Sequence, residues 1–593
     1  MTDRKMTCDV LVVGSGGAGL RAACAAAEAG ACVLLAAKGR VDRSGATLLA
    51  GANVSADVMC DGGSLWRMGI KSADPRDTQE QWFRDIVHEG FYLNRRELVR
   101  QYVEQAPAEV AGLLRSGAAL TAADEGGRQI GIPGSAILDV LWRRARDASV
   151  RVLQDVTLCD LLADGNAMAA GALLLDIPTG ELIEVSAGAV VLATGGMHGC
   201  YAFNSGTTGL CGEGQAAAIR LGADMTLMEM VTFCPDVICA PRRFRGNILP
   251  YILQCIGYGS LKNRLDEDFL PQYYSPSAIR LALGSEWNKL LLSYAMWREA
   301  QAGRCDENGG VRYSLASLTP GERAALEETL PQLSRGIYRD IMALHDRQGW
   351  LSVSAAGHYF DGGIAVNADM AASVPGLFAA GECTGGLFGA NRVAAATTQM
   401  LVQGAAAGKS AARYARAAGT RSVDPGVLER ACAEALAPLY APGGESPRRV
   451  RAATVEIVSR CAGIVRNAQD MTEGIRQLDE TDGLMAAPQR RERACNREWL
   501  DALETRSLRI CGRAILQSSL ARCESRGVFI RSDCPMTDND RFLCETRLHS
   551  GGVVLQPVEQ GRTSAEPGRT DYFEELERVF ARLSYAEGGA VHE

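Results

Sequence analysis

The sequence predicts an α/β protein in which a Rossmann-like dinucleotide-binding domain carries an inserted α+β domain and is followed by a helical C-terminal domain. An apolar strand at residues 9–13 ends in a glycine-rich turn and continues into an Ala-rich helix that reaches Gly30. A second apolar strand, residues 189–193, also ends in glycines. Residues 242–352 are richer in Arg, Pro, Tyr and Leu and interrupt the alternation of strands and helices. This order of elements is typical of a parallel sheet covered by helices, with one inserted domain.

The glycines of the first turn follow the spacing G-x-G-G-x-G. Gly14 allows a tight turn, Gly16 lets the backbone approach a pyrophosphate, and Gly19 lets the helix pack closely on the strand. The N-terminus of the helix also offers free N–H groups and the positive end of its dipole to phosphate groups. Together the strand, turn and helix predict the binding of a dinucleotide.

The second strand, residues 32–36, lacks the acidic residue that usually follows it in a nicotinamide-binding domain. Ala37 and Lys38 stand there instead, which argues against NAD. The next polar turn, residues 43–47, lies in a Gly-Ala-rich segment. Its backbone could lie against a flat cofactor ring, and an ordinary loop is the other interpretation.

Apolar periodicity predicts the remaining elements. The predicted helices are 78–118, 393–418, most of 425–526 and 571–585, and the predicted strands are 150–162, 167–174 and 181–192. At 593 residues the chain is too long for one hydrophobic core, so several domains are expected. The predicted bounds are 1–241 and 355–418 for a discontinuous cofactor-binding domain, 242–354 for a capping domain, 419–545 for a helical domain and 546–593 for a C-terminal tail.

The composition, with 47% hydrophobic and 22% charged residues, is typical of a globular protein. The formal net charge of −8 argues against a general nucleic-acid-binding surface. Because the chain has no run of about 18 apolar residues, we expect no membrane span. The first strand begins close to Met1 and leaves no room for a signal peptide. We therefore expect a cytoplasmic location, in which any membrane association is made through a partner subunit.

The 19 cysteines are scattered, and no two of them form a C-x-x-C pair. This pattern argues against an iron–sulfur cluster or a structural zinc on this chain, so we predict no metal site. Most of the cysteines are interpreted as small buried hydrophobic residues. Cys234, Cys239 and Cys383 lie near the motifs below, but nothing specific makes them reactive.

Together these motifs resemble the flavoprotein subunits of the succinate dehydrogenase/fumarate reductase family, which includes L-aspartate oxidase and the adenylylsulfate reductase α subunit. The resemblance runs from about residue 10 to 540, and the order and spacing of its motifs match the family. The motifs are the G-x-G-G-x-G turn, Arg43-Ser44, Ala193-Thr194-Gly195-Gly196, Thr208-Gly209, Gly212-Glu213-Gly214, His358-Tyr359, Gly362-Gly363, Gly381-Glu382, Gly389-Ala390-Asn391-Arg392 and Glu524-Ser525-Arg526-Gly527.

The resemblance implies FAD as the cofactor. In the family, the first turn holds the pyrophosphate, residues 194–196 lie near the adenosine, and Glu382 bonds the ribityl hydroxyls; a lysine such as Lys38 after the second strand is familiar. Respiratory members attach FAD through a histidine after Arg-Ser, whereas this chain has Gly45, so we expect non-covalent FAD. The expected cofactor-binding residues are Gly14, Gly16, Gly17, Gly19, Lys38, Ser44, Gly45, Thr194, Gly195, Gly196, Glu382, Arg392 and Thr397.

The resemblance also implies hydride transfer at N5 of the flavin. An enzyme that reduces an activated C=C bond must hold the substrate's carboxylate beside the flavin and supply a proton to the second carbon. In the family, a His and an Arg hold that carboxylate, and both are present as His358 and Arg392. Arg suits this role because its fork of donors matches a carboxylate in two parallel bonds.

Other family signatures are absent. The Phe-His-Pro-Thr segment appears as Phe233-Cys234-Pro235-Asp236, which loses a second substrate histidine, and Thr-Glu aligns with Gly246-Asn247. The Arg-Asp pair, whose arginine passes the proton, aligns with Asn288-Lys289. Asn cannot act as that acid. Lys289 is a candidate for a displaced donor, although a solvated surface lysine is the more ordinary interpretation.

Two further departures lie near the C-terminal motifs. Phe529 stands where a histidine usually follows Arg526, and Ala396-Thr397 stands where the family shows Asn-Ser. His198 follows the second glycine turn and is read chiefly as structural. The arginines at the start of the inserted segment could attract an anionic substrate, but a solvated turn is the simpler interpretation. These arginines are Arg242, Arg243 and Arg245.

The sequence therefore favours an FAD-dependent oxidoreductase that acts on a CH–CH group of a small anionic substrate, an unsaturated or saturated carboxylate other than fumarate or succinate. A separate iron–sulfur or other electron-transfer subunit, or a diffusing donor, would exchange electrons with FAD. Two alternatives remain open. One is an oxidase or an adenylylsulfate-reductase-like enzyme. The other is a non-catalytic FAD subunit that only relays electrons.

Overall fold

The computed structural model describes most of the chain. The described residues are 2–50, 53–55, 65, 67–68, 70, 77–120, 122–123, 128–249, 259–284, 286–329, 331–484 and 486–583. Part of the predicted capping domain, residues 250–258, lies outside them. All the expected cofactor-binding and catalytic residues lie within them.

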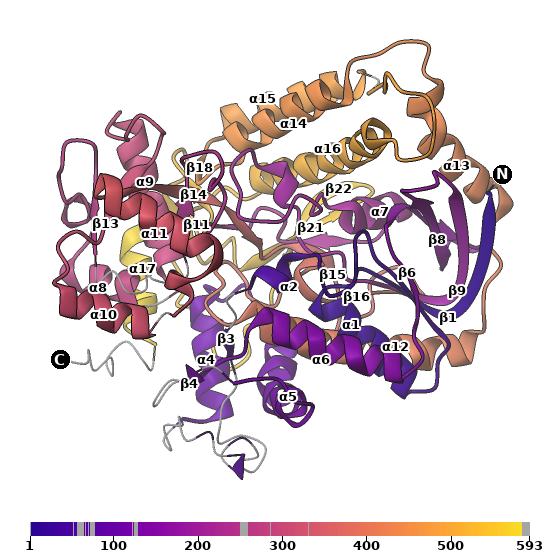
Figure 1. The fold of residues 1–593 in the computed structure, drawn as a ribbon, viewed down its shortest axis with the longest axis horizontal. Coiled ribbons are helices and arrows are strands. Elements are labelled where there is room, and N and C mark those ends of the chain that lie inside the picture. Colours follow the sequence, from indigo (N-terminus) through magenta and orange to yellow (C-terminus); the bar gives the residue numbers. More distant parts are fainter. Residues whose placement is uncertain are drawn as a thin grey trace.

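A mostly parallel sheet forms the centre of the cofactor-binding domain (Figure 1). The strand order is β6-β2-β1-β9-β8-β7, and β16 also pairs with β9. β1, β2, β6, β9 and β16 pair in parallel, whereas β7 and β8 form an antiparallel extension. The strands are β1 Arg4–Val13, β2 Val33–Ala36, β6 Arg151–Leu153, β7 Val156–Ala163, β8 Ala169–Asp176, β9 Leu182–Leu192 and β16 Leu377–Ala379.

Helices α1 (Gly17–Glu28), α12 (Ala396–Ala418) and α6 (Gly134–Asp147) lie beside this sheet (Figure 1). Glycines allow α12 to approach α1 closely. A methyl group at Gly408 would lie 2.1 Å from the Ala22 carbonyl oxygen, so this contact requires a residue without a side chain. Two segments almost 400 residues apart in the sequence are thereby joined into one domain.

A second sheet connects the C-terminal region to the cofactor-binding domain. Its order is β17-β15-β10-β21-β22, and β10 pairs antiparallel with both β15 and β21. Its strands are β10 Met225–Thr226, β15 Gly363–Ala365, β17 Thr384–Gly385, β21 Cys544–His549 and β22 Gly552–Pro557. The predicted start of the tail, residue 546, therefore falls inside a strand of this sheet.

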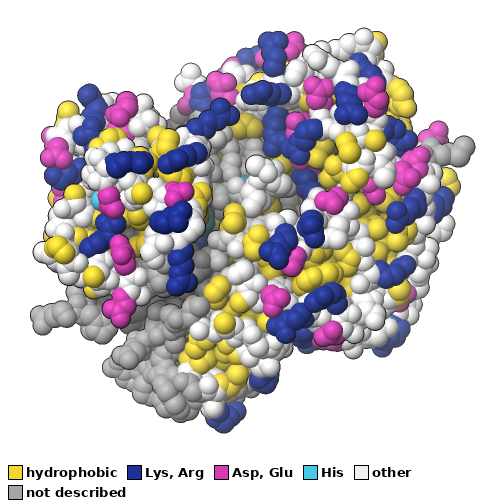
Figure 2. Space-filling view, viewed as in Figure 1, with side chains coloured by type: hydrophobic (Ala, Val, Ile, Leu, Met, Phe, Trp, Pro, Cys, Tyr) yellow, Lys and Arg dark blue, Asp and Glu magenta, His cyan; other side chains and the backbone are white. Residues whose placement is uncertain are grey.

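The inserted segment forms a lobe with its own antiparallel sheet, in the order β11-β14-β13-β12 (Figure 1). The strands are β11 Val231–Ile238, β12 Ser260–Lys262, β13 Val311–Ser314 and β14 Leu351–Phe360, and the helices are α8 Pro276–Gly284, α9 Asn288–Gln301, α10 Pro320–Thr329 and α11 Gly336–Gln348. Of these strands, β11 lies entirely before the predicted bounds 242–354, and β14 extends beyond their end. Figure 2 shows a furrow between this lobe and the rest of the molecule, and acidic and basic side chains are interspersed on the face shown.

Long helices dominate the C-terminal region, where α14, α15 and α16 pack side by side (Figure 1). They are α13 Pro425–Tyr440, α14 Pro447–Cys461, α15 Ala468–Asp482 and α16 Arg497–Ala521, followed by α17 Tyr572–Phe580. The predicted helix over 78–118 is two helices, α4 Gln79–Glu89 and α5 Arg96–Arg115. The smaller elements are α2 Ala46–Leu49, α7 Glu213–Leu221, β3 Asn53–Ser55, β4 Ala122–Ala123, β5 Gln129–Gly131, β18 Val465–Arg466, β19 Ile530–Arg531, β20 Met536–Asp538, β23 Arg569–Asp571 and the 3₁₀ turns His198–Cys200, Leu270–Gln272, Pro331–Ser334 and Gly381–Cys383.

In the described part of the chain, no helix combines the length and apolar character needed to cross a bilayer.

Gly408→Ala should destabilise the protein by about 1–3 kcal/mol, because the added methyl group must push α12 away from α1. The measurement is the free energy of unfolding in urea, followed by tryptophan fluorescence. Gly112→Ala is the matched control, because Gly112 lies in α5 and a methyl group there would meet no atom within 4 Å. The control should stabilise the protein by roughly 0.5–1 kcal/mol through helix propensity alone. Equal effects of the two substitutions would contradict the close helix contact.

Candidate active site

The glycine turn after β1 has the geometry that a pyrophosphate site requires. Gly14 has a φ of +112°, and a Cβ there would lie 2.2 Å from the Ala193 carbonyl oxygen. A Cβ at Gly19 would lie 1.8 Å from the Gly14 oxygen, whereas the nearest atom to a Cβ at Gly16 is 3.6 Å away. Two glycines are therefore required by backbone contacts, and Gly16 faces space in which a ligand can approach.

The N-terminus of α1 suits an anion. Gly16 caps the helix without a side-chain hydrogen bond, and the first turn contains no acidic residue. The Gly17 N–H donates to Thr47 Oγ1 at 3.1 Å, which fixes the loop after residue 45 against the helix. The dipole and the remaining first-turn N–H groups are not neutralised by a carboxylate of the helix itself.

The end of β9 brings a second set of groups to the same place. Gly195 has a φ of +76°, and its carbonyl accepts from Gln215 Nε2 at 2.8 Å. Thr194 Oγ1 is buried and has no hydrogen-bond partner in the protein. A buried hydroxyl without a partner costs free energy, so this atom is suited to hydrogen-bond a bound molecule.

Glu382 lies inside the molecule rather than on its surface. Its Oε1 accepts from Phe360 N at 3.3 Å and lies 3.7 Å from His198 Nε2. A Cβ at Gly196 would be 2.4 Å from this oxygen, so the glycine makes room for the carboxylate. Burial raises the pKa of Glu382, and His198 and backbone N–H groups oppose that rise. His198 also donates from Nε2 to the His358 carbonyl at 2.6 Å, which agrees with a structural role.

Lys38 lies after β2 and binds the C-terminal region. Its Nζ forms ion pairs with Glu213 of α7 and, at 2.9 Å, with Glu504 of α16. Burial lowers the pKa of Lys38, but the two carboxylates outweigh that effect and raise it. Lys38 therefore joins the cofactor-binding domain to the helical region, whatever it contributes to the cofactor.

One cluster in the described part of the chain has the geometry of possible metal ligands. Atoms of Cys211, Glu213 and Glu504 lie within 4.8 Å of one another. Lys38 and Arg451 form ion pairs with these two carboxylates. Because side-chain cations already balance the acids, we interpret the cluster as a buried ion network.

The loop before α2 is open around residue 45. Gly45 has a φ of +86°, and a Cβ there would meet no atom within 4 Å. Ser44 Oγ donates to the Arg40 carbonyl at 2.7 Å, and Thr397 is half-buried as the second residue of α12. Residue 45 therefore has no side chain to reach a cofactor ring.

The two residues expected to hold the substrate's carboxylate lie close in the fold. His358 lies on β14, and its Nδ1 is 2.8 Å from Ser205 Oγ. Burial, Lys289 and Arg392 all lower the pKa of His358, so the imidazole is neutral at physiological pH. His358 can therefore offer one hydrogen bond rather than a positive charge.

Arg392 is buried but keeps a donor available. Its guanidinium lies 4.6 Å from the centre of the Tyr359 ring, Nη1 donates to Ala394 O at 3.2 Å, and Nη2 is 3.8 Å from Glu286 Oε2. Nε is buried and has no hydrogen-bond partner in the protein. Asn391 next to it is also buried, with both side-chain polar atoms unpartnered.

The interpretation of Lys289 as a solvated surface residue was wrong. It lies in the first turn of α9, is buried, and forms an ion pair with Glu286. Burial and the positive charge of Arg392 lower the pKa of Lys289, and Cys234, Asp236 and Asp361 oppose that effect. The inserted lobe therefore brings a buried amine to Arg392.

Two more carboxyl groups surround this amine. Burial raises the pKa of Asp236 on β11 and of Asp361 after β14 to about 7 each. Asp361 accepts from Thr232 Oγ1 at 2.8 Å. Burial also raises the pKa of the nearby Cys234 thiol to about 12, so it is not a reactive thiolate.

Sequence reasoning did not assign roles to Ser205, Asp236, Glu286 or Asp361. In the sequence, Asp236 stands out only because it replaces the Thr of the Phe-His-Pro-Thr segment. Glu286 precedes Lys289 by three residues, the spacing of neighbours on a helix surface, and that spacing was the available signal.

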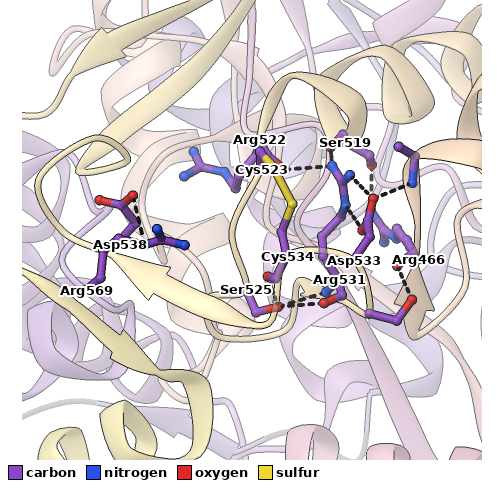
Figure 3. The surroundings of a disulfide bond; sticks show 12 residues. Arg466, Ser519, Arg522, Cys523, Ser525, Arg531, Asp533, Cys534, Asp538 and Arg569 are labelled. Carbon is purple, nitrogen blue, oxygen red and sulfur yellow. Dashed lines mark hydrogen bonds and ion pairs between the residues drawn. A yellow bond between two sulfur atoms is a disulfide. The ribbon is translucent and has the colours of Figure 1, made fainter.

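The Glu-Ser-Arg-Gly motif is structural in its contacts. Arg526 is fully buried and makes two hydrogen bonds of 2.8 Å to Glu524 and one to Asn539. A disulfide between Cys523 and Cys534 closes the surrounding loop (Figure 3). Of the 15 free cysteines in the described residues, 11 are buried, which confirms the main interpretation of the cysteines, although the disulfide was not predicted.

The exposed arginines at the start of the inserted segment fit the interpretation of a solvated turn. These are Arg242, Arg243 and Arg245.

Comparison with known proteins agrees with these features. Residues 9–398 match the family described as FAD binding domain, and residues 451–572 match the one described as Fumarate reductase flavoprotein C-term. A fumarate reductase (CoM/CoB) subunit of Methanothermobacter marburgensis is 29% identical, over 89% of this chain and 95% of that protein. L-aspartate oxidase of Streptomyces coelicolor is 27% identical, over 88% of each. The solved structure of Mycobacterium smegmatis Sdh1 in complex with UQ1 has a TM-score of 0.80 at 27% identity, over 94% of this chain and 95% of that chain.

The glycine turn, the uncapped helix N-terminus and the unpartnered Thr194 hydroxyl define a dinucleotide-dependent oxidoreductase, and they fit the phosphates and hydroxyls of FAD. The chain belongs to the FAD binding domain family. It is an FAD-dependent oxidoreductase of the fumarate reductase/succinate dehydrogenase flavoprotein type, and the expected resemblance, fold class and cofactor are confirmed.

Precipitation of the purified protein with trichloroacetic acid should release all of its flavin, because Gly45 offers no side-chain atom for a covalent bond. The measurement is flavin absorbance in the supernatant and fluorescence of the washed pellet. A flavoprotein with covalently attached flavin, treated in the same way, is the control. A yellow, fluorescent pellet would contradict non-covalent binding.

Proposed function

We propose that the protein transfers a hydride between FAD and a small anionic substrate, an unsaturated or saturated carboxylate other than fumarate or succinate. The observation that carries this proposal is the buried Arg392, whose Nε has no hydrogen-bond partner in the protein. Its positive charge acts on the neutral His358 and on the buried Lys289. A buried cation with a free donor is suited to a carboxylate. The names of similar proteins, fumarate reductase among them, support chemistry at a CH–CH bond.

The glycine turn, Thr194 and Glu382 would hold FAD against the edge of the central sheet. When bound, FAD supplies the hydride, or accepts it in the reverse direction. Arg392 would bind the carboxylate of the substrate through Nε and a neighbouring N–H. The Tyr359 ring beneath the guanidinium fixes its plane, and Tyr359 itself is held by a hydrogen bond to Gln399. His358, oriented by Ser205, would donate one hydrogen bond to the same end of the substrate.

Lys289 is the proposed proton donor. In the reduction, one carbon of the double bond receives the hydride and the adjacent carbon receives a proton from the Nζ ammonium group. Glu286 is in direct contact with Nζ and can keep the amine protonated between turnovers. A lowered pKa favours proton transfer, because a less basic amine is a stronger acid.

Electrons would reach the flavin from a separate iron–sulfur or other electron-transfer subunit. Several similar proteins are named as subunits, which supports this proposal. A cytoplasmic location, with membrane association through such a partner, stays part of the proposal.

Anaerobically reduced protein should be reoxidised fast by an α,β-unsaturated carboxylate other than fumarate, and slowly by fumarate. The measurement is stopped-flow absorbance of the flavin, with a panel that also contains adenylylsulfate and oxygen. Arg392→Lys, which keeps the charge but loses the fork of donors, should raise the carboxylate concentration needed for half-saturation. Fast reaction with adenylylsulfate or oxygen alone would favour an adenylylsulfate-reductase-like enzyme or an oxidase. No reaction with any small molecule would contradict the proposal and favour electron relay.

Lys289→Gln should slow the reoxidation step by about 10²–10⁴-fold, the usual contribution of a positioned acid, with little change in the substrate concentration needed for saturation. In the wild type, the rate should fall as the pH rises through the lowered pKa of Lys289, because only the protonated amine can donate. The variant should lose this alkaline limb. The measurement is the pH profile of the limiting rate.

Lys262→Gln is the matched control, since Lys262 lies on β12 of the same lobe, is partly exposed and pairs with Asp266. It should leave both the rate and its pH profile unchanged. A Lys289 variant that kept the wild-type rate and alkaline limb would contradict its role as donor.

A further inference from the structure

Carboxyl groups outnumber cations around the site where the substrate would bind. Among the residues that the structure describes, Arg392 and Lys289 are the basic side chains there. Arg392 interacts with Glu382 and Asp361, and Lys289 interacts with Asp236 and Asp361, while both approach Glu286. The acids at this site are Asp236, Glu286, Asp361 and Glu382, of which the first three are buried and the last is partly buried.

Asp236 is the acid least accounted for by the protein itself. It lies on β11 two residues after Cys234, and both residues interact with Lys289 of the facing helix α9. Asp236 is 2% exposed, and its Oδ1 has no hydrogen-bond partner in the protein. A buried carboxyl oxygen without a donor is costly, so it is suited to accept a hydrogen bond from a bound molecule.

Lys289 connects Asp236 to the carboxylate-binding end of the site. Its charge acts on His358 as well as on Asp236, and Arg392 acts on both Lys289 and His358. Helix α9 packs on β11, and Ser293 Oγ of α9 donates to the Phe233 carbonyl of β11 at 3.2 Å, so the strand that carries Asp236 lies against the helix that carries Lys289. A substrate held by Arg392 and His358 with its reacting carbon toward Lys289 would point its far end toward this strand. Burial raises the pKa of Asp236 to about 7, so above that pH a second carboxylate at that end would meet an ionised carboxyl group in a buried environment, where like charges repel strongly.

We propose that Asp236 determines the substrate class, and that the substrate carries one carboxylate, bound by Arg392, and a hydrogen-bond donor such as an amide at its far end. The inference rests on the proposed function, because it assumes that Arg392 binds a carboxylate. Asp236 accepts a hydrogen bond from the donor and excludes dicarboxylates by repulsion. It is a specificity-determining residue that takes no part in hydride or proton transfer.

Succinate and succinamate are a matched pair of probes, since they differ only in the replacement of one carboxylate by an amide. Binding to the oxidised holoenzyme can be measured by perturbation of the flavin absorbance, without turnover. At a pH above 7, where Asp236 is ionised, the wild type should bind succinamate about tenfold or more tightly than succinate, where tenfold corresponds to roughly 1.4 kcal/mol. Equal or tighter binding of succinate would overturn the inference, and this comparison needs no variant.

Asp236→Asn tests the residue. It removes the charge and adds a donor, so the preference for succinamate should disappear or reverse. Asp340→Asn is the control, because Asp340 lies on α11 of the same lobe with a half-exposed side chain, and it should keep the wild-type preference. An unchanged preference in Asp236→Asn would overturn the assignment to Asp236.

Reoxidation of the reduced flavin by fumarate and by fumaramate separates the two proposals. Faster reaction with fumaramate supports both. Faster reaction with fumarate would overturn the monocarboxylate inference and leave a carboxylate reductase. If neither compound bound or reacted, the carboxylate site itself, and with it the proposed function, would fail.

Discussion

The close contact of backbone segments around Gly14 is the constraint on which the site depends. The carbonyl of Ala193, just after β9, leaves no room for a side chain at Gly14, and the carbonyl of Gly14 leaves none at Gly19 in the first turn of α1. This contact sets the ends of two parallel strands and the N-terminus of one helix at a single point. Parallel strands that end together beside a helix N-terminus form a site for phosphates. Thr194 and Glu382 are placed relative to the same point by β9 and by the turn after β16.

The inserted lobe brings its own charged groups to Arg392. β11 and β14 pair with each other, so His358 and Asp236 are fixed on one sheet, and α9 packs against β11 with Lys289. Arg392 and Glu382 belong to the cofactor-binding domain. The lobe thus carries His358 with the proposed proton donor and the proposed selective carboxyl group, whereas the domain beneath it carries Arg392 and the groups proposed to hold FAD.

The sequence predicted the cofactor-binding half better than the substrate-binding half, for a physical reason. The glycine turn and the strand before Thr194 are local patterns, because each depends on residues that are neighbours in the chain. The burial of Lys289 depends on how α9 packs on β11, more than 50 residues earlier in the sequence, and no local pattern records that contact. For the same reason, the raised pKa values of Asp236 and Asp361 could not be expected from their types or positions.

The pairing of β10 with β21 has a consequence for synthesis of the protein. Thr226 lies beside Arg547, so the sheet next to the cofactor site gains its fourth strand only after more than 300 further residues have been added. While the ribosome is still translating the helical region, the edge of β10 that later pairs with β21 has no partner strand. The sheet that joins the C-terminal region to the cofactor-binding domain is therefore completed only when the last tenth of the chain has been synthesised.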